Sequence, residues 1–159
     1  MALKRLQNEL KQLIKEPTYF FSVFPNDKNF FIWDVLLIGP PDTPFENGII
    51  KAQFEFSTDY PNKAPKFKFI TNLFHPNVYP DGKVCISILH EGVDEFGYES
   101  LSERWNPSQS VNSILMSILS MLSAPNFESP ANVDASKLWR DNYSEYKNII
   151  YKMVADSQK

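Results

Sequence analysis

The chain has 159 residues, of which 43% are apolar and 22% are charged, so its composition is that of an ordinary globular protein with a sizeable core. A net charge of −3 and the absence of dense lysine and arginine runs argue against nucleic acid as the main partner. One cysteine excludes an internal disulfide, and with only two histidines it cannot make a usual structural zinc site without carboxylate ligands.

The same composition bounds location and domain organisation. No segment reaches the ~20 consecutive apolar residues of a membrane-spanning helix, and residues 1–6 lack the long apolar stretch of a secretory signal. A lone cysteine suits a reducing compartment. We therefore predict a single cytoplasmic domain over residues 1–159, with no metal and no direct insertion into a membrane.

The N-terminal half predicts one helix followed by strands. Apolar residues recur at helical spacing over residues 2–15 and stop before Pro17, which indicates an amphipathic helix. Runs rich in aromatic and β-branched residues then predict strands over 19–24, 31–38, 50–56 and 67–70. Because short, turn-rich connections join successive strands, we expect an antiparallel meander of four strands.

The C-terminal half predicts a long loop and then helices. Residues 71–107 show no regular pattern, and a loop of this length in a compact domain is usually functional or disordered. A helix capped by Ser110 and stopped by Pro125 should follow, then a short one from Asn132 through Trp139. The final helix is expected over 144–154, and its apolar residues are expected to face inward: Tyr146, Ile149, Ile150 and Met153. This order of elements predicts an α+β fold.

The long loop contains the most reactive residue of the chain. His75-Pro76-Asn77 precedes the turn signal Pro80-Asp81-Gly82, and Cys85 follows it. The turn is expected to fold the Asn77 amide back beside the Cys85 thiol. A thiol can carry an acyl group, and an amide N–H can stabilise the oxyanion that forms when the acyl group is transferred.

These residues resemble the catalytic segment of the ubiquitin-conjugating enzymes, and other motifs agree in order and spacing. They are Tyr60-Pro61 with Pro65, His75-Pro76-Asn77, Cys85-Ile86-Ser87-Ile88-Leu89, Trp105-Asn106-Pro107 and Ser129-Pro130-Ala131-Asn132. The resemblance covers nearly the whole chain. It implies the ubiquitin-conjugating fold, a ubiquitin thioester on Cys85, and transfer to a lysine with help from a RING ligase. It implies no metal or small cofactor, because ATP is used upstream by the activating enzyme.

The connection between Cys85 and Trp105 is longer than in most of that family and is acidic. In this it resembles the acidic-loop members that serve endoplasmic-reticulum-associated degradation, although the insertion here is shorter and carries Asp94-Glu95. The resemblance implies recruitment to the endoplasmic-reticulum surface by a partner. Asp94 and Glu95 are then expected to position the acceptor lysine and guide its amine, since carboxylates are too acidic to be efficient bases at neutral pH. Tyr98 is expected to line the groove in which the acceptor lysine is positioned.

We also assign expected roles to Asn77, His75 and His90, which lie near Cys85 in the sequence. Asn77 is expected either to hold the catalytic loop or to donate to the oxyanion, and the residues alone leave both roles open. We expect His75 to be structural, with its ring satisfying buried backbone groups. His90 lies five residues past Cys85 and is a candidate for tuning charge at the site.

The resemblance also implies a partner surface. Lys4, Arg5 and Lys11 on the first helix are candidates for contacts with the activating enzyme. Asn62, Trp105 and Pro107 lie in the two loops that, with that helix, form the docking surface for RING domains in the family. Many members have an aromatic residue where Asn62 stands, so we expect an altered ligase preference. The protein is expected to act as a monomer.

Other functions remain open at this stage. The chain could be a non-catalytic ubiquitin-binding variant of the same fold, or it could conjugate a related modifier. A cysteine hydrolase that uses Cys85 with His75 or His90 is a further alternative. Such an enzyme needs the imidazole within hydrogen-bond reach of the sulfur.

Overall fold

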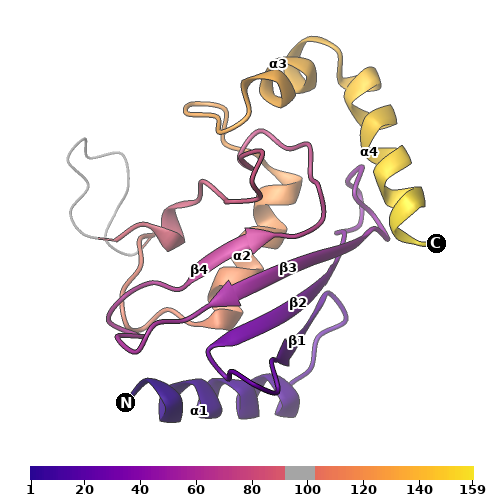
Figure 1. Cartoon of the computed structure of the whole chain (residues 1–159). Helices are drawn as coiled ribbons and strands as arrows, with labels where there is room; N and C mark the ends of the chain where they lie inside the picture. The colour runs from indigo at the N-terminus through magenta and orange to yellow at the C-terminus, as the bar shows by residue number, and fades with distance from the viewer. Residues whose placement is uncertain (92–102) are drawn as a thin grey trace.

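The computed structural model describes residues 1–91 and 103–159. The four strands form one antiparallel sheet in the order β1-β2-β3-β4 (Figure 1), with bounds Phe21–Pro25, Ile32–Ile38, Ile49–Glu55 and Lys66–Phe69. One row of the register runs across it, pairing Val23 with Val35, Val35 with Ala52, and Ala52 with Phe69. The predicted meander is confirmed.

The two faces of this sheet differ in polarity. Side chains alternate along each strand, and one set is buried, for example Trp33, Val35 and Leu37 of β2. Helix α2 (Val111–Ser123) crosses this face (Figure 1) and contributes the buried apolar residues Ile114, Leu115, Ile118 and Leu122. The other face carries exposed polar residues, among them Lys66 and Lys68 of β4. The core therefore lies between the sheet and α2.

Helix α1 (Ala2–Lys15) has the bounds that the sequence predicts. It buries Ala2 and Leu6, whereas Leu3 and Ile14 of its apolar set are exposed. The inward face is thus narrower than the apolar spacing suggests. In Figure 1 the helix lies below the β1 edge of the sheet, well away from α3 and α4.

The helices after the long loop begin at the caps that the sequence indicates. Ser110 and Ser113 form a capping box for α2, and the Ala135 N–H donates to Asn132 Oδ1 (3.0 Å) at the start of α3 (Val133–Asp141). Helix α4 (Tyr143–Ser157) is longer than predicted: it begins one residue earlier, where Asn142 caps it by accepting from the Glu145 N–H (3.2 Å), and it ends three residues later.

One inward assignment in α4 is wrong. Ile149 is 41% exposed, whereas Val154 is buried. The buried stripe follows i, i+4, i+8 spacing through Tyr146, Ile150 and Val154, and Ile149 lies to one side of it. No helix in the described part of the chain is both long and apolar enough to cross a membrane.

Candidate active site

A tight hairpin carries the segment before the thiol. The Gly82 N–H donates to Tyr79 O (2.9 Å), and the Tyr79 N–H donates to Lys83 O (2.8 Å). Gly82 has φ 93°, in the left-handed region that favours glycine. The predicted turn at Pro80-Asp81-Gly82 is confirmed.

The same glycine fixes the hairpin to the sheet. The Phe69 N–H at the end of β4 donates to Gly82 O (2.8 Å), and Lys68 and Lys83 form a β-bridge. A Cβ placed on Gly82 would lie 2.2 Å from Phe69 O, which leaves no room for a side chain. The hairpin is therefore held against the edge strand, and the thiol follows directly from it.

Cys85 lies opposite Asn77 across this hairpin. Its N–H donates to Asn77 O (2.8 Å), next to a bridge between Val78 and Val84. The residue is partly exposed, and the short 3-10 helix η1 (Ser87–Leu89) turns the chain away after it. The backbone at Cys85 is thus fixed by its hydrogen bond to Asn77, while the Cys85 side chain remains partly exposed to solvent.

The Asn77 side chain connects this hairpin to the segment after α2. Its Nδ2 donates to Asn126 O (2.8 Å) and its Oδ1 accepts from the Asn126 N–H (2.9 Å). Pro76 O accepts from the N–H groups of Ala131 (2.8 Å) and Asn132 (3.0 Å). Asn77 is 1% exposed. These bonds hold two segments together that are far apart in sequence.

His75 has a structural environment, as expected. It is fully buried, its Nδ1 accepts from the Asn77 N–H (3.0 Å), and its Nε2 donates to Met121 O of α2 (2.9 Å). Burial disfavours the charged imidazolium and lowers the pKa of His75 to about 4. Because both ring nitrogens bind the backbone, His75 is not placed to act as a base for Cys85.

The segments on either side of residues 92–102 are joined at their ends. His90 O accepts from the Trp105 N–H (3.0 Å), and Arg104 Nη2 donates to Glu91 O (2.7 Å). His90 itself is partly buried. The predicted site residues Asp94, Glu95 and Tyr98 lie outside the described residues.

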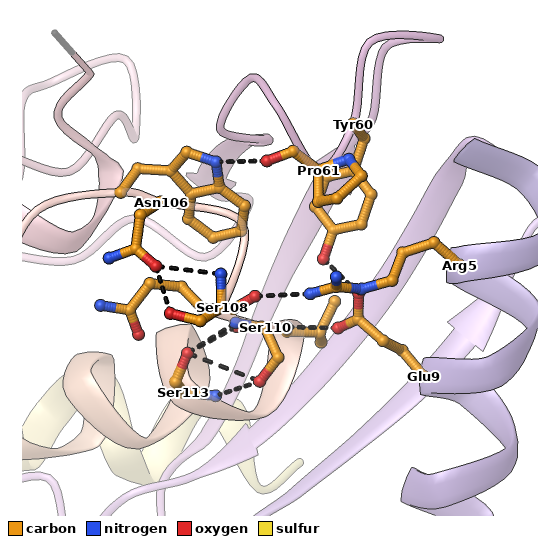
Figure 2. A network of polar contacts seen from close by, with 11 residues as sticks. Arg5, Glu9, Tyr60, Pro61, Asn106, Ser108, Ser110 and Ser113 are labelled. Carbon is orange, nitrogen blue, oxygen red and sulfur yellow. Dashed lines mark hydrogen bonds and ion pairs between the residues drawn. The ribbon is translucent and has the colours of Figure 1, made fainter. Parts of the chain in front are cut away.

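A polar network joins α1, the proline loop and the start of α2 (Figure 2). The Glu9 carboxylate accepts from the Tyr60 hydroxyl, from Arg5 Nε (2.9 Å) and from the Val111 N–H (2.8 Å). Arg5 Nη2 also donates to Gln109 O (2.7 Å). The Glu9 side chain is 11% exposed. A carboxylate at the N-terminus of α2 is also favoured by the helix dipole.

Burial raises the pKa of the Tyr60 hydroxyl, and the hydrogen bond to Glu9 raises it further. The hydroxyl therefore stays protonated and keeps its role as a donor. The Tyr60 ring packs against Trp105, with ring centroids 5.7 Å apart. Trp105 Nε1 in turn donates to Pro61 O (2.8 Å), so the proline loop and the tryptophan loop are bonded to each other.

The predicted partner-surface residues do not share one environment. Lys4, Lys11, Asn62 and Pro107 are exposed, whereas Trp105 is 7% exposed. Arg5 is partly buried and holds α1 to the segment before α2. Whether any of the six contacts a partner stays a prediction, but Arg5 and Trp105 also have internal bonds to maintain.

Sequence reasoning missed three residues that organise the site. Glu9 follows Arg5 by four residues, so the helical i, i+4 rule could have paired them. Tyr60 stands in a quoted motif, but nothing local indicates its bond to α1. Asn126 binds the Asn77 side chain through its backbone atoms, and no sequence pattern reports that. Among the described residues, no group of His, Cys, Asp and Glu could hold a metal ion.

Comparison with known proteins agrees with this geometry. The ubiquitin-conjugating enzyme family model matches residues 5–154. Human ubiquitin-conjugating enzyme E2 G2 is 52% identical over 158 residues, which is 98% of this chain and 96% of the relative. Ubiquitin-conjugating enzyme E2 13 of Arabidopsis thaliana is 51% identical (97% and 94% covered). The probable ubiquitin-conjugating enzyme E2 7 of Caenorhabditis elegans is 49% identical (97% and 95%).

Proposed function

The chain belongs to the ubiquitin-conjugating enzyme family, whose members transfer ubiquitin, and we propose that it does so through a thioester on Cys85. The observation that carries this proposal is the hairpin that presents a partly exposed thiol opposite Asn77. The family acts with ubiquitin, an activating enzyme and a ligase. The sequence around the thiol and its fixed backbone support Cys85 as the acceptor in that chain of transfers.

The proposed reaction has two acyl transfers. In the first, Cys85 Sγ attacks the C-terminal carbonyl carbon of ubiquitin on the activating enzyme, a C–S bond forms, and the activating enzyme's thiolate leaves. In the second, a deprotonated lysine amine attacks the same carbon. A C–N bond forms, the Cys85 thiolate leaves, and the proton lost from the amine passes to solvent. The first transfer exchanges one thioester for another and is nearly balanced in energy.

Charging of Cys85 is the direct test. With activating enzyme, ATP and ubiquitin, the protein should form an adduct that thiol reductants cleave, and Cys85→Ser should give a more stable oxyester or none. Ubiquitin relatives in parallel reactions identify the modifier. A reducible adduct that persists in Cys85→Ala would overturn the assignment. Release of free ubiquitin without any adduct would instead favour a hydrolase.

Asn77 is proposed to hold the catalytic loop during aminolysis, and its two bonds to Asn126 support that role. Asn77→Ala should still charge but should discharge to lysine roughly 10²-fold more slowly in single turnover, the scale of a misplacement of the reacting groups by about 1 Å. Asn126→Ala is the control, because it keeps the backbone atoms that Asn77 binds and removes only a side-chain bond to the exposed Glu128 N–H (2.9 Å), so its discharge rate should stay close to that of wild type. Equal loss of charging and discharge would indicate a damaged fold.

We also propose a RING-type ligase as the partner of the surface made by α1, Asn62 and Pro107. The exposure of Asn62 and Pro107 on two loops that are bonded to each other supports a preformed docking site. A RING domain titrated into isotope-labelled protein should shift the Lys4 and Asn62 amide signals. Shifts confined to α3 and α4 would exclude this surface.

We also propose a role in endoplasmic-reticulum-associated degradation, because the acidic insertion resembles that subgroup. A partner is then expected to recruit the protein to the membrane surface, and the protein is expected to be a cytoplasmic monomer. Depletion of the protein should stabilise a misfolded substrate of that pathway, and light scattering should give the mass of one chain. Unchanged substrate turnover would contradict the pathway, and a dimer mass would contradict the monomer.

A further inference from the structure

Helix α3 packs against both of the segments that the Asn77 side chain joins. The ring centroid of Trp139 in α3 lies 6.2 Å from that of His75, which stands two residues before Asn77. The same indole lies 6.0 Å from the ring of Phe127, the residue after Asn126. One aromatic side chain therefore contacts the chain on each side of the two hydrogen bonds between Asn77 and Asn126.

The segment that binds the Asn77 side chain has no regular structure. Residues 124–132 connect α2 to α3 and are neither helix nor strand. Asn126 is exposed, so its own burial does not fix the backbone atoms that bind Asn77. The adjacent Phe127 is partly buried, and its ring meets the Trp139 indole in an edge-to-face arrangement at 65°. This aromatic contact is therefore suited to hold the Asn126 backbone in place.

Helix α3 is itself bonded to the segment before the thiol. The N–H groups of Ala131 and Asn132 both donate to Pro76 O, and Asn132 is the N-cap of α3. Trp139 follows this cap by seven residues, and because that spacing is close to two helical turns, both lie on the same side of α3. The helix therefore meets one short segment at two points, at the Pro76 carbonyl and at the His75 ring.

Helix α4 supports the Trp139 indole from a further direction. The ring of the fully buried Tyr146 lies 4.7 Å from that of Trp139. The Tyr146 hydroxyl donates to Phe74 O (2.7 Å), directly before His75. The indole, which is partly buried, therefore has a defined position between α4 and the two segments that it contacts.

We propose that Trp139 is a positioning residue for the transfer of ubiquitin from the thiol to lysine. Its ring fixes the two segments relative to each other, so that the Asn77 side chain keeps both of its bonds to Asn126. The proposal rests on the proposed function, because it needs a thioester on Cys85 and a role of Asn77 in aminolysis. A misplacement of about 1 Å can cost ~10²-fold in rate. Because Trp139→Leu loosens the connection without removing it, discharge should slow by roughly tenfold.

Single-turnover discharge of ubiquitin from Cys85 to free lysine is the first test. In Trp139→Leu the rate at saturating lysine should fall, whereas charging and the lysine concentration that gives half the maximal rate should stay close to wild type. Trp139→Phe keeps an aromatic ring between the two segments and should recover most of the rate. Phe127→Ala removes the contact from its other side and should slow discharge to a similar extent. This second variant also provides the test if Trp139→Leu does not fold.

Tyr143→Leu is the matched control. The Tyr143 ring lies 5.2 Å from that of Trp139, and among the described residues no ring contact joins it to His75 or Phe127. The variant therefore removes an aromatic contact of the same indole without touching either segment. It should discharge at a rate close to that of wild type, and a loss as large as in Trp139→Leu would overturn the proposal.

A double-mutant cycle separates positioning from general destabilisation. If Trp139 acts through Asn77, Trp139→Leu should slow discharge roughly tenfold in the wild-type background and should have almost no further effect in Asn77→Ala. A residue that only stabilises the fold would slow both backgrounds by the same factor, and that result would contradict a positioning role.

The Asn77 side-chain amide gives a readout that does not depend on turnover. Its Nδ2–H donates to Asn126 O within a buried residue, so it should exchange with water more slowly than a free side-chain amide. In Trp139→Leu and Phe127→Ala this exchange should become faster, while the backbone amides of β2 and β3 keep their protection. Unchanged exchange at Asn77 in both variants would overturn the proposal. If wild type formed no adduct, the thioester function would fail, and this measurement would still decide whether Trp139 fixes Asn77.

Discussion

His75 and Asn77 position the segment that carries the Cys85 thiol through hydrogen bonds to backbone groups. Asn77 O binds the Cys85 N–H, the Asn77 side chain binds Asn126, and His75 binds Met121 O. The hairpin is therefore fixed at once to the sheet edge, to α2 and to the segment after α2. A substitution at His75 or Asn77 should therefore shift the backbone segment that carries Cys85.

His75 should make stability depend on pH in a defined window. Its pKa of about 4 in the fold is below the ordinary value of 6.5 for the unfolded chain. The unfolded state then binds the extra proton first, so stability is fully present above pH ~6.5 and is lost as pH falls toward 4. Between pH 7 and pH 5 we expect a loss of about 2 kcal/mol in the free energy of unfolding.

Urea unfolding across this range measures the effect, and two variants identify its source. His75→Gln removes the titrating group and should flatten the pH dependence. His90→Gln removes the other histidine and should leave it in place. A wild-type curve that is flat from pH 7 to 5 would show that the fold does not lower the pKa of His75.

At this scale the sequence predicts local relations and misses distant ones. The spacing of Asn77, the Pro80-Asp81-Gly82 turn and Cys85 predicts their meeting, because one turn brings them together. The partners of the Asn77 and His75 side chains lie 49 and 46 residues away. Their contacts depend on how α2 packs on the sheet, and no local pattern encodes that.

At the scale of elements, Glu9 joins three parts of the molecule that the sequence treats separately. Its carboxylate connects α1 to Tyr60 of the proline loop and to Val111 at the start of α2. The bounds of α1 follow from apolar spacing and a proline stop. The role of Arg5 does not, because a basic residue on a helix has the same sequence pattern whether it binds a partner or its own chain.

Glu9→Ala should therefore have effects beyond α1. It leaves the Tyr60 hydroxyl and the Val111 N–H without their acceptor, so we expect a loss of about 2–3 kcal/mol in the free energy of unfolding. Because α1 and the loops together form the proposed ligase surface, ligase-stimulated discharge should fall more than unstimulated discharge.

Denaturant unfolding and discharge assays with and without a RING domain measure the two effects. Asn8→Ala, at the neighbouring exposed position of α1, is the control and should change stability by less than about 0.5 kcal/mol. If Glu9→Ala reduced both discharge rates by the same factor, the network would stabilise the fold without a specific effect on ligase-stimulated discharge.

At the scale of the whole molecule, the thiol lies where the sheet half meets the helical C-terminal half. Helix α4 is bonded to the N-terminal half of the chain near both of its ends. Tyr146 donates its hydroxyl proton to Phe74 O (2.7 Å), just before His75, and the Ile49 N–H of β3 donates to Ser157 Oγ (3.0 Å). These links support the predicted single domain, in which the C-terminal helices and the sheet unfold together.

Two adjacent isoleucines in α4 test that cooperativity. Ile150 is fully buried and Ile149 is 41% exposed, although the sequence pattern places both inward. Ile150→Ala should lower the free energy of unfolding by about 2–5 kcal/mol, because it leaves a cavity in the core. Ile149→Ala should cost less than about 1 kcal/mol, since its side chain already contacts solvent.

Native-state hydrogen exchange then shows whether one unit or two is affected. If the chain is one domain, Ile150→Ala should reduce the protection of the slowest amides in α4 and in β2 and β3 by the same free energy, because all of them exchange through global unfolding. Loss of protection in α3 and α4 alone would show that these helices open as a separate unit. In that case His75 would lose its packing against Trp139 of α3 while the sheet stayed folded. Charging of Cys85 in Ile150→Ala should then fall well below the temperature at which the sheet unfolds.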